Sequence, residues 1–195
     1  MKKVNIAVIG YGQWGRNHVR VWASLGCLQA VCDADPQRLQ EVRNRFPHVD
    51  TYSRPEAVLE RDDIVGVVIA TPAPTHAMLA LQALQAGKDV LVEKPMALTL
   101  EEGQQMVDTA QRLGRILMVG HVLEYHPAVQ RLRQLVAEGA LGRIQYIYSH
   151  RLNLGRIRTE ENVLWSFAPH DIALILRLLD TMPEEVACYG EAYLN

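Results

Sequence analysis

The stretch VNIAVIGYGQWG, residues 4–15, determines the fold class of this 195-residue chain. Val4–Ile9 is an apolar run interrupted only by Asn5, which is typical of a parallel strand buried on both faces. The pattern G-x-G-x-x-G follows directly, and Gln13–Leu25 then has apolar side chains at helical spacing. The expected stripe of this helix consists of Trp14, His18, Val21, Trp22 and Leu25. Three glycines between a buried strand and a helix predict a dinucleotide-binding turn.

Each glycine of this pattern has its own physical role. Gly10 permits the tight turn, Gly12 lets the main chain approach a pyrophosphate, and Gly15 lets the helix pack closely on the strand. The first turn of the helix offers free N–H groups and a partial positive charge to the phosphates. We assign the intervening Gln13 and Trp14 to the same cofactor site.

An acidic residue at the end of the next predicted strand indicates which dinucleotide binds. Asp33 follows Gly15 by 18 residues, where a carboxylate can accept hydrogen bonds from both hydroxyls of the adenosine ribose. A 2′-phosphate would be repelled there, and no arginine directly follows Asp33. The sequence therefore predicts NAD rather than NADP. Asp35 is expected to be the N-cap of a helix that begins at Pro36.

Strands and helices continue to alternate up to residue 121, which predicts an α/β, doubly wound parallel sheet. We assign residues 1–121 to this Rossmann domain. The further predicted strands are Leu28–Cys32, Ile64–Ala70, Asp89–Val92 and Ile116–Val119, and the further helices are Pro74–Gln85, with Thr75 as a cap, and Leu98–Leu113, with Thr99 and Glu102 as a capping box.

The pattern changes after Gly120, and residues 122–195 are expected to begin a second, α+β domain for a substrate. We expect this unit to be incomplete, and we expect a complete one to form a homo-oligomer. Its predicted elements are a helix over Pro127–Glu138, a strand over Arg143–Leu152, a helix over Ile172–Leu179 and a strand over Val186–Leu194.

The composition excludes several classes of function. A net charge of −2 argues against nucleic-acid binding, which requires a concentrated basic surface. Neither a membrane-spanning apolar run nor a signal peptide is visible, so we expect a cytoplasmic protein without a membrane partner. Cys27, Cys32 and Cys188 form no CxxC pair and are interpreted as buried thiols, and no metal site is predicted.

A proline-containing loop follows the strand predicted over Ile64–Ala70. Ligands of open α/β sheets bind at the carboxyl ends of the strands, so this loop is expected to line the nicotinamide half of the cofactor. We assign Thr71, Pro72 and His76 to that role.

The tripeptide Glu93-Lys94-Pro95 also follows a predicted strand. Together with the glycine pattern, the 71–76 loop and Gly120-His121, it resembles the Gfo/Idh/MocA family of oxidoreductases over the whole chain. The resemblance implies that Glu93 and Lys94 lie beside the nicotinamide and that Lys94 is catalytic. The positive charge of an oxidised nicotinamide is also expected to favour the neutral amine form of a nearby lysine. That amine can help to hold the proton of a reacting hydroxyl.

A second catalytic residue follows from the same resemblance. His170 matches the histidine of the family's D-x-G-x-H segment, and its near-neutral pKa suits proton removal from an alcohol. Ser166 stands where the family has aspartate, and Ala168 replaces the glycine. Asp171 is expected either to substitute in part for the missing carboxylate or to cap the helix.

The substrate is predicted from the segment Gly120–Pro127, which has the pattern G-H-x-x-x-(aromatic)-x-P. This segment is similar to the corresponding segment of the family members that oxidise the 3-hydroxyl of UDP-N-acetylglucosamine or its uronate. Alternatives are a dehydrogenase of polyols or simple sugars, such as an inositol, and a non-catalytic NAD-binding sensor or scaffold. The candidate diphosphate clamp is Arg151, Arg156 and Arg158, the candidate sugar contacts are His121, Tyr125 and Asn153, and His126 and His150 are interpreted as structural.

Overall fold

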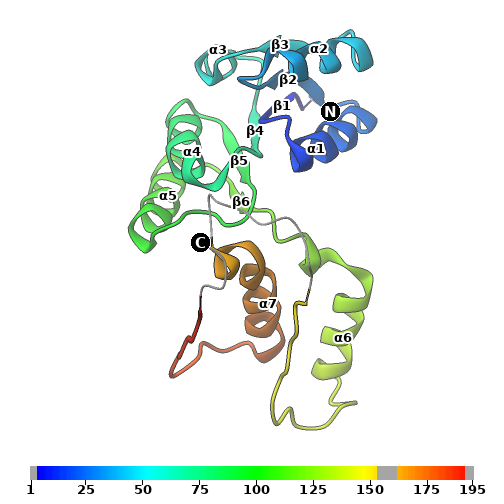
Figure 1. Cartoon of the computed structure of the whole chain (residues 1–195), viewed down its shortest axis with the longest axis vertical. Helices are drawn as coiled ribbons and strands as arrows, with labels where there is room; N and C mark the ends of the chain where they lie inside the picture. The colour runs from blue at the N-terminus through cyan, green and yellow to red at the C-terminus, as the bar shows by residue number, and fades with distance from the viewer. Residues whose placement is uncertain (1–3, 153–161, 192–195) are drawn as a thin grey trace.

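The computed structural model describes residues 4–152 and 162–191. Its centre is a six-stranded, all-parallel sheet in the order β3-β2-β1-β4-β5-β6 (Figure 1). This order reverses direction between β1 and β4, which confirms the predicted doubly wound fold. The strands are β1 (Ile6–Ile9), β2 (Leu28–Cys32), β3 (Asp50–Tyr52), β4 (Gly66–Ile69), β5 (Asp89–Val92) and β6 (Leu117–Val119).

Helices cover both faces of this sheet because the strand side chains alternate between two apolar clusters. Ile6 and Val8 of β1 pack with residues of α1 (Gln13–Ser24) and α2 (Pro36–Arg45). Ala7 and Ile9 face the other way and pack with the remaining helices of this domain. Those helices are α3 (Pro55–Leu59), α4 (His76–Gln85), which the 3₁₀ turn η1 (Ala73–Thr75) precedes, and α5 (Leu100–Leu113).

The helix ends follow most of the sequence signals. Asp35 accepts a hydrogen bond from Gln37 N at 2.8 Å, and Thr99 accepts one from Glu102 N at 3.2 Å, so both predicted caps are confirmed. Thr75 occupies the N-cap position of α4 as predicted, but its hydroxyl bonds to Thr71 Oγ1 and Pro72 O instead of a helix N–H.

The buried face of α1 differs from the predicted apolar stripe. Gly15 and Val19 are its buried residues, whereas Trp14 is 43% exposed and Leu25 is 62% exposed. Gly15 lacks a side chain, so this face of the helix approaches the β1 turn most closely and turns Val19 inward. A stripe predicted from apolar side chains misses this face of the helix, because glycine has no side chain to count.

The segment beyond β6 contains the 3₁₀ turn η2 (Val122–Tyr125), α6 (Pro127–Ala137) and α7 (Val163–Leu179). Figure 1 shows α6 and α7 together at the end of the molecule away from α2 and α3. None of the described residues between 122 and 191 is buried. The helix predicted over Ile172–Leu179 begins earlier, at Val163, and includes Pro169 in its interior.

Two strands predicted in this segment are corrected. Residues 143–152 lie in no strand, and neither do residues 186–191, the described part of Val186–Leu194. Tyr146 and Tyr148 alternate with polar neighbours as a strand would, yet they are 84% and 77% exposed. Alternation alone does not make a strand, because a strand also needs a partner for its main-chain hydrogen bonds.

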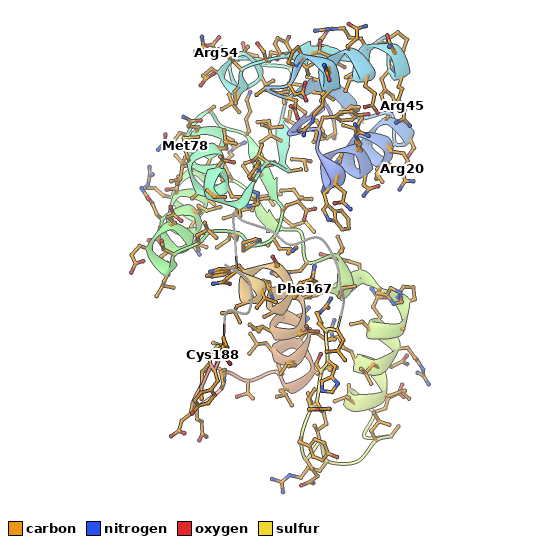
Figure 2. The ribbon with its side chains drawn as sticks, viewed as in Figure 1. Arg20, Arg45, Arg54, Met78, Phe167 and Cys188 are labelled. Atoms are coloured by element: carbon orange, nitrogen blue, oxygen red, sulfur yellow. The ribbon has the colours of Figure 1, made fainter. Side chains whose placement is uncertain are left out.

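The cysteines and the shortest elements also depart from expectation. Cys32 is buried, but Cys27 is half-buried and Cys188 is exposed on the segment beyond α7 (Figure 2), so the interpretation of three buried thiols is corrected.

The sequence analysis does not predict strand β3 or helix α3, since each is too short for a periodic pattern. No helix in the described residues is both long enough and apolar enough to cross a membrane.

Candidate active site

The glycine turn between β1 and α1 is sterically demanding. Gly10 has a φ of +96°, and a Cβ there would lie 2.7 Å from the carbonyl carbon of Ala70. A Cβ at Gly15 would lie 1.9 Å from the carbonyl oxygen of Gly10. A side chain at either position would force the turn, β4 and α1 apart, so the expected steric roles of both glycines are confirmed.

The second glycine faces open space instead. A Cβ at Gly12 would meet no atom of the described chain within 4 Å, and its φ of −76° is accessible to any residue. Gly12 is also the N-cap of α1 and supplies no side chain to satisfy the first N–H groups. Gln13 and Trp14 are exposed beside it. Open space above bare main chain at a helix N-terminus fits a dinucleotide pyrophosphate.

The predicted ribose ligand, Asp33, is 7% exposed and already organises the turn. Its Oδ2 accepts a hydrogen bond from Tyr11 N at 2.6 Å, and its Oδ1 accepts one from Asp35 N at 2.8 Å. Arg38, from the first turn of α2, lies 3.4 Å from Asp33 Oδ2. No arginine directly follows Asp33 in the sequence, but helix geometry brings Arg38, five residues later, back to it, so a cation is present at this position.

The loop that follows β4 is joined to the loop that follows β5 by His76. This side chain is 1% exposed, and its Nδ1 lies 2.7 Å from Pro95 O and its Nε2 2.9 Å from Thr71 O. Pro72 is exposed and Thr71 is half-buried. The structure therefore places Thr71 and Pro72 at the carboxyl edge of the sheet and His76 beneath them.

The Glu93-Lys94-Pro95 loop brings the first domain into contact with α7. The Lys94 ammonium donates a hydrogen bond to the carbonyl oxygen of Ser166 at 2.8 Å. Ser166 lies in the first turns of α7, four residues before His170. The two predicted catalytic residues, 76 positions apart in the sequence, are therefore gathered at one edge of the sheet.

His170 lies in an environment that disfavours its charged form. Burial lowers its pKa below the usual 6.5, and the charges of Lys94, Arg151 and His121 lower it further, while Glu93 opposes them. His121 contacts it edge to face, with ring centroids 6.2 Å apart. The Nδ1 atoms of both histidines are buried without a hydrogen-bond partner among the described residues. A neutral imidazole in this position can accept a proton.

The predicted substrate residues are only partly gathered around this histidine. Arg151 forms an ion pair with Asp171, which also accepts a hydrogen bond from Ser149 Oγ at 3.1 Å. Asp171 thus anchors the 149–151 segment to α7 and does not cap the helix. Tyr125 is 63% exposed in η2. Asn153, Arg156 and Arg158 lie outside the described residues.

Two histidines that were interpreted as structural have local partners. The side chain of His126 is the N-cap of α6 and accepts a hydrogen bond from Ala128 N at 3.2 Å, and that of His150 is hydrogen-bonded to Tyr148.

An apolar cleft of about 610 Å³ separates α5 from α7 and reaches Pro95 of the Glu93-Lys94-Pro95 loop. His121 is among its lining residues. The cleft leaves much of the inner face of α7 in contact with solvent. Its apolar walls are Met96, Ala97, Leu100, Val107, Leu164, Trp165, Ile172 and Leu176.

Sequence reasoning missed two residues of this region. The helical spacing places His18 in an apolar stripe, but its Nε2 lies 2.7 Å from Glu93 Oε1. Arg38 had not been considered beside Asp33. The signal for His18 was a polar side chain among apolar helix positions, and the signal for Arg38 was a basic residue within one turn of the helix N-cap. Among the described residues, no group of three or more histidine, cysteine or acidic side chains is arranged to hold a metal.

Comparison with known sequences gives consistent matches. The model of the Gfo/Idh/MocA oxidoreductase family, described by its NAD-binding Rossmann fold, matches residues 4–121. The UDP-N-acetylglucosamine 3-dehydrogenase of Acidithiobacillus ferrooxidans is 34% identical over 98% of this chain and 59% of its own length. The D-apiose dehydrogenase of Paraburkholderia graminis is 35% identical over 73% of this chain and 38% of its own length. The chain thus spans from about two fifths to three fifths of these relatives.

Solved structures show the same similarity. An oxidoreductase domain protein from Kribbella flavida superposes with a TM-score of 0.78 at 27% identity, covering 92% of this chain and 55% of the other. The WlbA dehydrogenase from Chromobacterium violaceum, solved with NADH and UDP-GlcNAcA, superposes with a TM-score of 0.67 at 28% identity. That match covers 73% of this chain and 42% of the other.

Proposed function

The chain belongs to the Gfo/Idh/MocA oxidoreductase family, and on that premise we propose that it is an NAD-dependent dehydrogenase of sugar hydroxyl groups. The observation that carries the proposal is the convergence of three features at one edge of the sheet. They are the bare main chain at Gly12, the Lys94 ammonium and the His170 imidazole. We place the boundary between the cofactor unit and the substrate unit at residue 121.

The first unit supplies the cofactor site. The first turn of α1 faces the pyrophosphate, and Asp33 accepts hydrogen bonds from the adenosine ribose. Thr71, Pro72, Glu93 and Lys94 line the nicotinamide half, while His76 supports both loops from below. The proposal of NAD over NADP rests on the charge of Asp33, with Arg38 as the opposing influence.

Lys94 and His170 have different roles toward the substrate hydroxyl. When NAD is bound, it supplies the hydride acceptor at the nicotinamide ring. The Nζ group of Lys94 orients the hydroxyl, and the neutral imidazole of His170 accepts its proton. Burial supports this role for His170, because a lowered pKa keeps the imidazole neutral at physiological pH.

We propose the 3-position of a UDP-linked amino sugar, or of its uronate, as the site of oxidation. The support is the name of the Acidithiobacillus relative and the ligand of the WlbA structure. The D-apiose dehydrogenase relative favours a second candidate, a free simple sugar. One contact supports this second candidate, since Arg151 is engaged by Asp171 and must leave it to bind a diphosphate.

Cofactor binding is tested first, with the full chain and calorimetric titration of NADH. Gly12→Val fills the open space at the helix N-terminus, so NADH binding should disappear while the melting temperature stays unchanged. Gly190→Val is the matched control. A Cβ at Gly190 would also meet no atom within 4 Å, and Gly190 lies far from α1 in the sequence. Equal NADH affinity of wild type and Gly12→Val would refute the cofactor site.

The substrate is tested with the same protein by following NADH formation with UDP-N-acetylglucosamine, its uronate, D-apiose and myo-inositol. Turnover of a UDP-sugar alone supports the first candidate, and turnover of D-apiose or myo-inositol alone supports the second. NADH binding without turnover of any of the four would favour a non-catalytic sensor.

A further inference from the structure

A buried pair of ionisable side chains links α1 to the end of β5. His18 Nε2 lies 2.7 Å from Glu93 Oε1, and the two side chains are 15% and 9% exposed. The residues are 75 positions apart, so the contact joins two separate elements of the sheet domain. Because an ionised carboxylate only accepts hydrogen bonds, Nε2 is the donor.

The surroundings of Glu93 hold its carboxylate in one place. Its Oε2 accepts a hydrogen bond from the main-chain N–H of Lys94 at 3.3 Å. A Cβ at Gly120 would lie 3.0 Å from Oε2 and 3.1 Å from Cδ, so the carboxylate packs directly on bare main chain beyond β6. The main-chain N–H of Glu93 is fixed in turn by Ile69 O at 2.9 Å. Few other positions are open to this side chain.

We propose that His18 is a positioning residue, which fixes Glu93 and through it the main chain at Lys94 relative to the helix that faces the dinucleotide phosphates. The inference rests on the proposed function insofar as Lys94 handles the substrate hydroxyl. His18 and the N-terminus of α1 belong to one rigid helix. The pair therefore sets the distance between the phosphate site and the lysine by direct contact.

The polar pair has no advantage as simple core packing. Desolvation of buried ionisable groups offsets most of their attraction, so an apolar pair of similar volume is often equally or more stabilising. The neighbouring α1 residues on this face, Gly15 and Val19, are apolar and buried. Because the polar pair lies among apolar residues and directly beside Lys94, a role in orienting Lys94 explains it better than a contribution to the stability of the fold.

The pair also lies within electrostatic reach of the proposed base. Glu93 raises the pKa of His170, against burial and the charges of Lys94, Arg151 and His121. A displaced Glu93 carboxylate would therefore alter both the orientation of Lys94 and the charge balance at His170.

The experiment compares His18→Leu and His18→Gln with Arg20→Leu as the control on the same helix. Arg20 is exposed on the outer side of α1 (Figure 2). Amide hydrogen exchange of Lys94, Met96 and Ala97 is the first readout. We expect His18→Leu to accelerate it at least about fivefold, as local opening becomes easier, while β4 and β5 stay protected. His18→Gln retains a donor and should restore most of the protection.

Steady-state kinetics give the second readout. His18→Leu should lower kcat by about 10²-fold, because small misplacements of reacting groups cost this much, and should change KM for NAD by less than about twofold. If His18 acts through Glu93, the double variant with Glu93→Gln should be no slower than the slower single variant. Additive losses would show that the two residues act separately and would overturn the proposal.

The remaining outcomes are also decisive. Faster exchange across β4 and β5 as well, without rescue by His18→Gln, would show a structural role only. If wild type binds no NADH, the proposed function fails, but the exchange data still decide whether His18 positions Lys94. Should His18→Leu not fold, a wild-type nitrogen-15 histidine spectrum replaces it. It should show a protected proton on His18 Nε2, and an unprotonated Nε2 would overturn the inference.

Discussion

Ile69 in β4 is 0% exposed, whereas Ile172 in α7 is 50% exposed. The same contrast holds throughout the two regions that contain them. Residues 4–121 form two apolar clusters on either face of a parallel sheet, whereas none of the described residues from 122 to 191 is buried. Side chains in a close-packed interior have fixed positions, and half-exposed ones have more freedom. The two regions therefore differ in how firmly they hold their functional groups.

The proposed site draws on both regions. The phosphate turn, Asp33, Glu93 and Lys94 stand on the packed sheet, whereas His170 stands on α7. Contacts such as the hydrogen bond from Lys94 to Ser166 join the two. Under the proposed function, we therefore expect cofactor binding to depend on the core of the first region, and turnover to depend also on how α7 lies against it. Four predictions test the contrast.

The largest effect is expected at the junction itself. Lys94→Met removes the ammonium that serves the substrate and bonds to Ser166, and should lower kcat about 10³-fold, or about 4 kcal/mol in activation free energy. The affinity for NADH should change by less than about threefold, because the phosphate turn is untouched. Stopped-flow kinetics and calorimetry measure the two quantities. Near-normal turnover would remove Lys94 from the mechanism.

Matched truncations sharpen the packing contrast. Ile69→Ala leaves a cavity in a closed core and should lower the free energy of unfolding by about 3 kcal/mol. Ile172→Ala removes a side chain that lines the open cleft and should cost less than about 1 kcal/mol. Urea unfolding followed by circular dichroism measures both. Equal losses would mean that α7 is packed as tightly as β4, and the contrast would not hold.

The choice of cofactor should depend on one charge in the packed region. Asp33→Asn keeps a side chain that can accept from the Tyr11 amide, but removes the negative charge that opposes a 2′-phosphate. We expect NAD affinity to fall about tenfold, about 1.4 kcal/mol, and NADP affinity to rise or stay level. Asp35→Asn is the control at the N-cap of α2. A parallel loss of both cofactors would assign Asp33 to the turn alone.

The smallest effect concerns pH. Because burial lowers the pKa of His170 in the folded chain, the unfolded chain binds this proton first as the pH falls through about 6.5. The contribution of His170 to stability is therefore complete above that pH and declines below it, down to the lowered folded-state pKa. Unfolding at pH 7.5 and 5.5 should show a smaller decline in His170→Gln than in wild type. An equal decline would place His170 in a solvent-like environment.

The sheet domain could be predicted from the sequence because its signals are local. Apolar runs such as Val4–Ile9 and the caps at Asp35 and Thr99 depend on neighbouring residues, and the structure contains the corresponding elements. The strand predicted over Arg143–Leu152 failed because a strand requires a partner that no local pattern reveals. The predicted start of this helix, Ile172, is late because the prediction follows the apolar run that begins there, whereas α7 begins at Val163 and continues through Pro169.

By itself, the sequence determined the doubly wound class and the turn at Gly10, Gly12 and Gly15, because spacing and the absence of side chains are written directly in it. The family motif at Lys94 was visible in the same way. Only the tertiary structure placed His18 against Glu93, Arg38 beside Asp33 and Lys94 against Ser166. Those contacts join residues that are distant in the chain or separated by a turn of helix. Their distances are set by how the strands and helices pack, which no single segment encodes.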